Sequence, residues 1–140
     1  MSGIVGDGAC LRVGFLNVNS LKLQIQEIRQ FLHNDYSFHL FGIAESKLSP
    51  VVDDYLVRVK GYTLIRQDRK VGGGGVALYV RNTLKVKILE KSNTTFSGDC
   101  NELEYLMSSV QQGSFTPVFV AVVYRSPHVG FYSNKFDDHL

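Results

Sequence analysis

The first part of the chain has two apolar runs separated by a segment of helical periodicity. Residues 11–16 form a short, largely apolar run, typical of a strand buried on both faces, which stops at the polar Asn17. Ser20 can cap a helix whose apolar positions recur at spacings of three and four, at Ile25, Ile28, Phe31 and Leu32. A second apolar run covers residues 38–44. The pattern predicts a strand, a helix that ends near 33–35, and a second strand.

Strand patterns dominate the rest of the chain. Residues 61–66 and 76–80 are predicted strands of a hairpin, because a charged turn and four consecutive glycines, 72–75, lie between them. Three later segments also have strand patterns: 85–89, 103–110 and 118–124. The last of these is rich in β-branched residues and is predicted to be buried. Residues 132–140 are predicted to begin a helix.

Composition places the chain among ordinary globular proteins. Its 140 residues are 44% hydrophobic, which fits one domain or part of one. The two cysteines, Cys10 and Cys100, are too few for a disulfide framework and too far apart for a zinc knuckle, so a reducing compartment fits best. Residues 1–10 are small and glycine-rich, without secretory features, and are expected to be a flexible N-terminus. No apolar run reaches membrane-spanning length, so we expect an intracellular protein without a membrane partner.

Charge is unevenly distributed along the chain. The net charge of +2 is too small to indicate a partner, but nine basic and two acidic residues lie between Arg58 and Lys91. The segments on either side are net acidic. This asymmetry fits a polyanion-binding surface, and it fits a solvated face of lysine and arginine equally well. Candidates to contact backbone phosphates lie around the glycine run, at Arg66, Arg69, Lys70 and Arg81.

The glycine run does not match a nucleotide-binding phosphate loop. It lacks a Gly-Lys-Ser/Thr sequence and leads into a strand, whereas a phosphate loop leads into a helix. A flexible hairpin is the stronger interpretation, and it could still allow close backbone approach to DNA. The sequence also lacks Gly-x-Ser-x-Gly and His-Glu-x-x-His signatures, and its four histidines have no metal-ligand spacing.

Three predicted strands finish in polar side chains that suit phosphoester chemistry. Asn17 follows the first strand, Glu45 the second, and Tyr124 ends the last. If these strands neighbour one another in a sheet, the three side chains meet at one edge, where loops on a rigid scaffold build sites. A carboxylate there could hold Mg²⁺ against phosphate oxygens, while the amide and the phenol orient or donate to them.

A purely structural interpretation of the same residues is also open. A lone Glu after a strand is more often a helix or turn cap than a metal ligand, and a lone Asn there is more often a turn former. On spacing alone, this structural interpretation of Glu45 and Asn17 is the stronger one.

Four motifs in order resemble those of the apurinic-type endonucleases of non-LTR retrotransposons, a branch of the endonuclease/exonuclease/phosphatase (DNase I-like) superfamily. They are residues 15–21, 43–48, 69–81 and 122–127. Glu104 to Met107 also resembles the family's strand that begins with Glu. The likeness covers nearly the whole chain, from about Leu11 onward.

The resemblance implies a fold and a site. The fold would be α+β, a DNase I-like two-sheet sandwich flanked by helices, with residues 11–140 as the N-terminal part of the domain. Glu45 would be the ligand of Mg²⁺, with Mn²⁺ as a substitute. Asn17 would be the active-site asparagine, and Tyr124 would contact the scissile phosphate. The nucleic-acid contacts would be Asn19, Arg66, Arg69, Lys70, Arg81 and Arg125.

The resemblance also implies a function for the whole protein. That function is magnesium-dependent nicking of DNA, in the nucleus, to supply a primer end to a downstream reverse-transcriptase domain. The family completes its site with Gly-Asp-x-Asn and Ser-Asp-His motifs, which this sequence lacks. Asp138-His139 is interpreted as exposed helix polarity. The 140 residues are therefore expected to be inactive by themselves.

Two alternatives to a nuclease stay open. One is a phosphatase or phosphodiesterase of the same superfamily, since the Asn and Glu motifs are shared across its branches. The other is a noncatalytic remnant that acts as an interaction module. In either case a sandwich cut midway exposes sheet edges such as 118–123, which predicts association and poor solubility.

Overall fold

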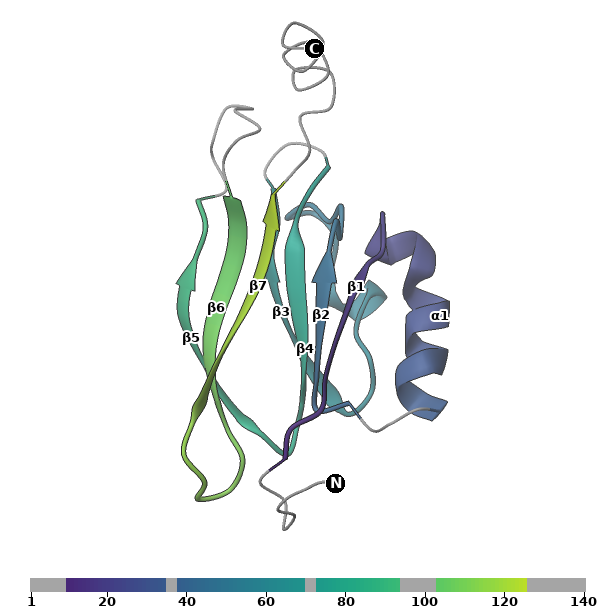
Figure 1. The fold of residues 1–140 in the computed structure, drawn as a ribbon. Helices are drawn as coiled ribbons and strands as arrows, with labels where there is room; N and C mark the ends of the chain where they lie inside the picture. Colours follow the sequence, from purple (N-terminus) through teal and green to yellow (C-terminus); the bar gives the residue numbers. More distant parts are fainter. Residues whose placement is uncertain (1–9, 35–37, 70–72, 94–102, 126–140) are drawn as a thin grey trace, which may run out of the picture.

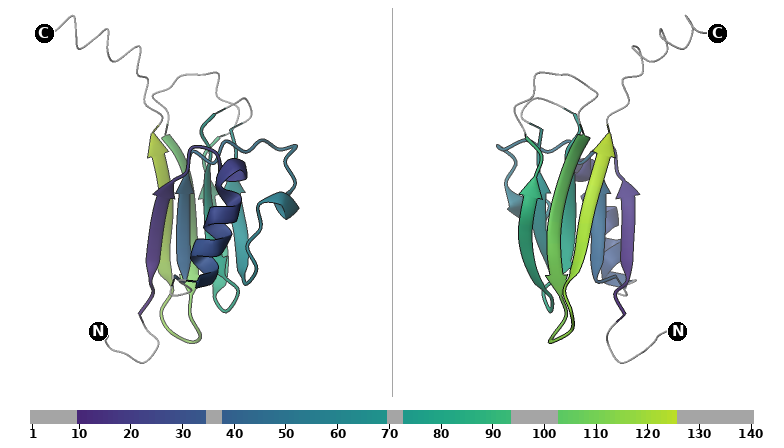
Figure 2. Two further views of the ribbon diagram at one scale, coloured as in Figure 1. Left: turned by 90° about the vertical axis from the view of Figure 1, so that its right-hand side faces the viewer. Right: turned by 60° about the vertical axis from the view of Figure 1, so that its left-hand side comes forward.

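Two β-sheets lie face to face, and one α-helix covers the outer face of the larger sheet (Figure 1). This computed structural model describes residues 10–34, 38–69, 73–93 and 103–125. The views in Figure 2 show the three layers in sequence: the helix, the four-stranded sheet and the three-stranded sheet. Among the described residues no helix is long and apolar enough to cross a membrane.

The larger sheet has the strand order β1-β2-β4-β3. Its members are β1 (Val13–Asn17), β2 (Leu40–Ala44), β3 (Tyr62–Gln67) and β4 (Val76–Arg81). Strands β1 and β2 are parallel, and α1 (Leu21–Asn34) makes the crossover that such a pair requires. The other two pairings are antiparallel, and β3 and β4 form the predicted hairpin. A 3₁₀ turn, η1 (Asp54–Leu56), precedes β3 and was not predicted.

The smaller sheet is an antiparallel meander in the order β5-β6-β7. Its strands are β5 (Lys85–Lys91), β6 (Leu103–Gln111) and β7 (Val118–Arg125). A bulge interrupts the β5–β6 pairing between Ile88 and Glu90. Strand β7 lies across from β2 and β4, and β6 lies across from β4 and β3.

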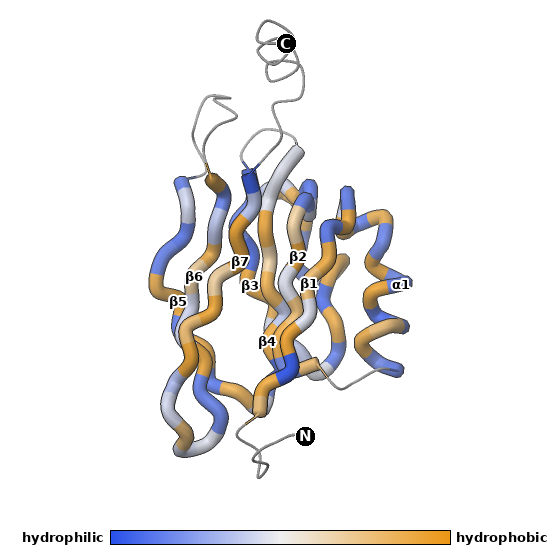
Figure 3. Tube along the Cα trace, viewed as in Figure 1, coloured by the Kyte–Doolittle hydropathy of each residue, from blue (hydrophilic) through white to orange (hydrophobic). Residues whose placement is uncertain are grey.

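The core has two layers because β4 is buried on both faces. Alternate side chains such as Leu78 face the smaller sheet, where they pack with Leu106, Val110 and Val122. Their neighbours, including Tyr79, face α1 and pack with Ile25, Ile28 and Leu32. Figure 3 shows hydrophobic residues along the central strands and recurring along α1 among hydrophilic ones. The predicted helix positions therefore form the second core layer, although Phe31 stays 41% exposed.

The predicted elements that lie within the described residues are present, but two burial predictions are wrong. The first run was expected to be buried on both faces, yet Val13 and Phe15 in β1 are 58% and 55% exposed. The run 118–124 was also expected to be buried, yet Phe119 in β7 is 79% exposed. Each strand pairs on one side only within the described part of the chain, so both are edge strands. They lie on the same side of the sandwich (Figure 2).

Several sequence-based predictions lie outside the described residues. They concern the flexible segment 1–9, the basic Lys70, the helix at 132–140 and the Asp138-His139 pair.

Candidate active site

The carboxylate of Glu45 is the centre of a polar cluster at one end of the sandwich. Asn17 donates its Nδ2 hydrogen to Glu45 Oε2 at 3.2 Å, and the Tyr124 hydroxyl donates to the same oxygen. Among the described residues no donor contacts Oε1, and Glu45 is only half-buried. The second oxygen is therefore the one that can accept an external cation.

The topology explains why these three side chains meet. In the parallel β1–β2 pair Asn17 lies opposite Ala44, so the carboxyl ends of both strands are level and Glu45 follows directly. Tyr124 comes from β7 in the other sheet. The sequence predicted that the three side chains meet if their strands neighbour one another in one sheet, and that condition is not met. The residues meet across the sandwich, because β7 packs face to face against β2.

The two hydrogen bonds favour the ionised form of Glu45. The Tyr124 hydroxyl, and then the Asn17 amide, lower the pKa of Glu45 below its ordinary value of 4.5, and partial burial opposes them. Lys47 and Arg69 add a smaller electrostatic contribution in the same direction. The carboxylate is thus in the charged form that binds a cation.

The Glu45 segment has an unusual backbone. Glu45 and Lys47 both have φ values of 54°, in the left-handed region that favours glycine. Such residues cost about 1–3 kcal/mol each and persist only where the surroundings determine them, most often at functional sites. On one side Ser20 and Leu21, at the start of α1, donate backbone N–H groups to the carbonyls of Glu45 and Ser46, both at 2.9 Å.

The glycine run supports the other side of this segment. Ser46 N–H donates to the Gly75 carbonyl at 3.1 Å, and Lys47 N–H donates to the Gly74 carbonyl at 2.7 Å. Gly75 has a φ of 93°, and a Cβ there would overlap Ser46 Oγ. A Cβ at Gly74 would come within 2.6 Å of the Arg69 guanidinium. Within the described residues, Gly74 and Gly75 therefore lie close to Arg69 and Ser46.

The predicted nucleic-acid contacts do not all gather at this end. Asn19 and Arg125 are exposed and flank Asn17 and Tyr124 in sequence. Arg69 is ion-paired with Glu104. Arg81 ends β4 beside His39, at the opposite end of the sheet from Glu45, where its guanidinium lies 5.9 Å from the Tyr62 ring.

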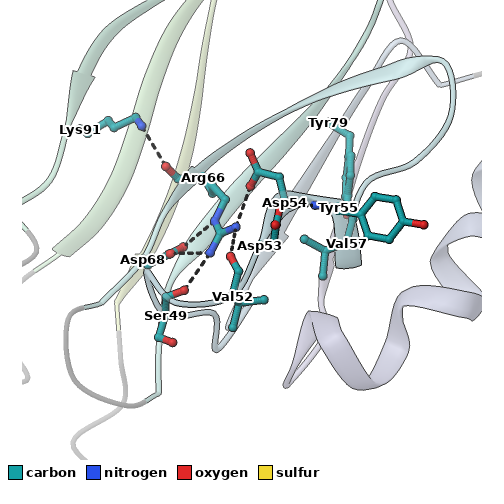
Figure 4. Close-up of polar contacts among 10 residues, drawn as sticks. All are labelled: Ser49, Val52, Asp53, Asp54, Tyr55, Val57, Arg66, Asp68, Tyr79 and Lys91. Atoms are coloured by element: carbon teal, nitrogen blue, oxygen red, sulfur yellow. Dashed lines mark hydrogen bonds and ion pairs between the residues drawn. The ribbon is translucent and has the colours of Figure 1, made fainter.

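Arg66 is enclosed by its own chain (Figure 4). Its Nε donates to Asp68 at 3.3 Å; Nη1 donates to the Val52 carbonyl at 2.8 Å and to Asp54 at 2.6 Å. Nη2 donates to the Ser49 carbonyl at 3.0 Å and to Asp68 at 2.7 Å. These bonds use all five N–H donors of a guanidinium, which leaves none for a phosphate. In the structure Arg66 joins the loop before η1 to β3.

Sequence reasoning gave no role to Glu104, which is buried in the smaller sheet. It is 4% exposed, accepts the Gly75 N–H at 2.6 Å and pairs with Arg69. A signal for it existed: in β6 Glu104 shares its inward face with Leu106, Ser108 and Val110. A carboxylate in an apolar register needs buried partners.

The donor set suits one part of a magnesium site. No group of three or more His, Cys, Asp or Glu side chains that could hold a metal occurs within the described ranges. Glu45 nevertheless offers a carboxylate oxygen, and Mg²⁺ is commonly held by one or two carboxylates together with water and substrate phosphate. The described residues thus fit a single protein ligand and do not form a closed cage.

Comparison with known proteins identifies the fold. No protein-family profile and no curated protein matches the chain. A humanized D. rerio TDP2 superposes with a TM-score of 0.60 at 19% identity, over 91% of this chain and 55% of that one. The AP endonuclease LMAP from Leishmania major gives 0.57 at 15% identity, over 90% and 44%. The human Nocturnin catalytic domain with bound sulfate anion gives 0.54 at 14% identity, over 86% and 51%.

These three proteins are members of the endonuclease/exonuclease/phosphatase superfamily. At such identities the likeness shows the fold alone. The predicted DNase I-like two-sheet sandwich is confirmed. The chain spans about half the length of each of these solved structures.

Proposed function

We propose that this chain, with its DNase I-like fold, is the N-terminal part of a divalent-metal-dependent DNA endonuclease that hydrolyses phosphodiester bonds. The observation that carries the proposal is the Asn17–Glu45–Tyr124 cluster, in which an ionised carboxylate keeps one oxygen without a donor from the described residues. An AP endonuclease is among the proteins that share the fold.

Each of the three side chains has a role that follows from its chemistry. Glu45 would hold Mg²⁺ or Mn²⁺ through Oε1, and the cation would neutralise charge that develops on the phosphate. Asn17 and Tyr124 fix the carboxylate through Oε2. The same amide and phenol are donors at the edge where a phosphate would lie, and each could transfer a hydrogen bond to a phosphate oxygen. The general base would come from outside the described residues.

The DNA backbone would be contacted by residues around this cluster. Asn19 and Arg125 are exposed and flank Asn17 and Tyr124 in sequence, and Arg69 is close enough to contribute to the lowered pKa of Glu45. Backbone contacts of this kind orient a duplex and make its affinity depend on salt.

We also propose that the whole protein is a non-LTR retrotransposon polyprotein that acts in the nucleus and carries a downstream reverse transcriptase. The four ordered motifs support this origin. The reading frame beyond Leu140 tests it: it should encode Gly-Asp-x-Asn and Ser-Asp-His motifs and then a polymerase domain. A frame that lacks the nuclease motifs would favour the noncatalytic remnant.

Nicking of supercoiled plasmid by the full-length protein tests the activity. We expect nicking that requires Mg²⁺ or Mn²⁺, and a loss of at least about 100-fold in Glu45→Ala, the order typical of losing a transition-state charge contact. Glu27→Gln on the exposed face of α1 is the matched control and should be unchanged. A Glu45→Ala protein that nicks at the wild-type rate would exclude the proposed role. Preferential hydrolysis of a small phosphate ester would favour the phosphodiesterase alternative.

A further inference from the structure

Glu104 is a buried carboxylate that connects the two sheets. It lies on β6 in the smaller sheet, and both partners of its side chain belong to the β3–β4 hairpin of the larger sheet. Oε1 accepts the Gly75 N–H at 2.6 Å, and Oε2 accepts a hydrogen bond from Arg69 Nη2. A buried charge is tolerated only with such partners, so the position of the carboxylate and the position of the glycine run depend on each other.

Gly74 and Gly75 in turn hold the segment that carries Glu45. Their carbonyls accept the N–H groups of Lys47 at 2.7 Å and Ser46 at 3.1 Å. Ser46 is fully buried, and its Oγ lies so close to Gly75 that a Cβ at that position has no room. An unbroken series of contacts therefore runs from the Glu104 carboxylate through the glycines to the residue after Glu45.

The Glu45 segment needs this support because its backbone is strained. Glu45 and Lys47 have left-handed φ values that a side chain disfavours, so the segment would relax toward another conformation if its outer hydrogen bonds were lost. The bonds to α1 hold only the carbonyls of Glu45 and Ser46. The N–H groups on the other side are held by the glycine run.

We infer that Glu104 is a positioning residue for the Glu45 carboxylate, acting through the backbone of Gly74 and Gly75. This inference rests on the proposed function for its catalytic consequence, because the Glu104 carboxylate bonds to Gly75 and Arg69 and not to Glu45 itself. Its structural content is independent of activity: removing the Glu104 carboxylate loosens the backbone at Ser46 and Lys47.

Amide hydrogen exchange of the full-length protein tests the structural content. In Glu104→Ala, and to a smaller extent in Glu104→Gln, exchange at the amides of Ser46 and Lys47 should become at least about ten-fold faster, while the amides of Leu78 and Val80 in the centre of β4 stay protected. Glu90→Gln is the matched control, because Glu90 is exposed and its carboxylate accepts from Tyr105 on the same sheet.

Two glycine substitutions provide a second test of the support given to Ser46 and Lys47, and they leave Glu104 unchanged. Gly75→Ala should give the same faster exchange, because its Cβ would displace Ser46. Gly61→Ala is its control: the φ values of the two glycines are similar, 93° and 89°, but nothing lies within 4 Å of a Cβ at Gly61. Gly61→Ala should therefore leave the amides of Ser46 and Lys47 unchanged.

The catalytic consequence is a change in metal dependence. In Glu104→Gln the Mn²⁺ concentration for half-maximal nicking should rise about 10- to 100-fold, the range seen when an outer-shell partner of a metal ligand is lost. The KM for DNA should not change. A general destabilisation would instead lower only the fraction of active protein and leave the Mn²⁺ concentration for half-maximal nicking unchanged.

The failures of the two proposals are distinguishable. If exchange at Ser46 and Lys47 is unchanged in Glu104→Ala and Glu104→Gln, the inference is overturned, whatever the activity and whatever Gly75→Ala does. If Glu45→Ala does not affect nicking, the proposed function fails, and the exchange data still decide the positional coupling. Faster exchange with an unchanged Mn²⁺ requirement would overturn the catalytic consequence.

Discussion

Replacement of Arg66 by alanine should destabilise the protein by about 3 kcal/mol, within the range for breaking a buried ion pair. The pair with Asp68 dominates this value, because its side chains are only 14% and 10% exposed and the aspartate would stay behind as a buried, uncompensated charge. The pair with Asp54 contributes little, since that aspartate is 64% exposed and exposed pairs are worth at most about 1 kcal/mol. Two backbone carbonyls, of Ser49 and Val52, also lose their donor.

Urea unfolding measures the effect on the free energy of unfolding. Tyrosine fluorescence can follow it, because the chain has seven tyrosines and no tryptophan. Arg58→Ala is the control. Arg58 is exposed, with its guanidinium carbon 4.6 Å from the centroid of the Tyr55 ring, so a change within about 0.5 kcal/mol is expected. Arg66→Lys should recover only part of the loss, since a lysine cannot reproduce the planar fork. A loss below about 1 kcal/mol in Arg66→Ala would refute the reasoning, because that is the value of an exposed pair.

Two further predictions concern the cluster and the exposed edges. The pKa of Glu45 is lowered, so the stability from its hydrogen bonds is fully present above the ordinary value of 4.5 and is lost as pH falls through the lowered pKa. In Tyr124→Phe an NMR titration of the Glu45 carboxyl should show a higher pKa than in the wild type. An unchanged pKa would contradict the assigned cause. The isolated chain should associate through its edge strands. Phe119→Lys places a charge at an edge position that is 79% exposed, so it should reduce the molecular mass measured by light scattering. A monomeric wild-type chain would contradict this prediction.

Local patterns in the sequence predicted the elements well. The helix begins directly after Ser20, whose Oγ accepts the Leu23 N–H at 3.4 Å, and the glycine run does join two antiparallel strands. These features depend on neighbours within a few residues. The same patterns also indicated which polar side chains follow strands, which is why Asn17, Glu45 and Tyr124 were recognised together.

The wrong predictions concern contacts between segments that are far apart in the sequence, which local patterns do not reveal. Alternation along a strand shows which residues point inward but not which sheet contains the strand, so the sequence could not show that Tyr124 lies across from β2 and not beside it. The β-branched run of β7 has the composition of a buried strand. Its burial, however, depends on which strands pair with it and which elements cover it, and the sequence does not show either. The number of charged residues in a segment does not distinguish Arg66, whose guanidinium is ion-paired with Asp68 and Asp54, from an exposed arginine.

Two hydrogen bonds join the two sheets, one between Tyr124 and Glu45 and one between Gly75 and Glu104. They make the site sensitive to how the sheets are aligned. A slip by one residue along a strand displaces side chains by about 3.3 Å, which would separate both pairs. Substitutions that alter packing between Leu78 and Val122, and that touch no polar group, should therefore weaken cation binding. Variants selected for lost activity are expected to include such apolar positions as well as Glu45.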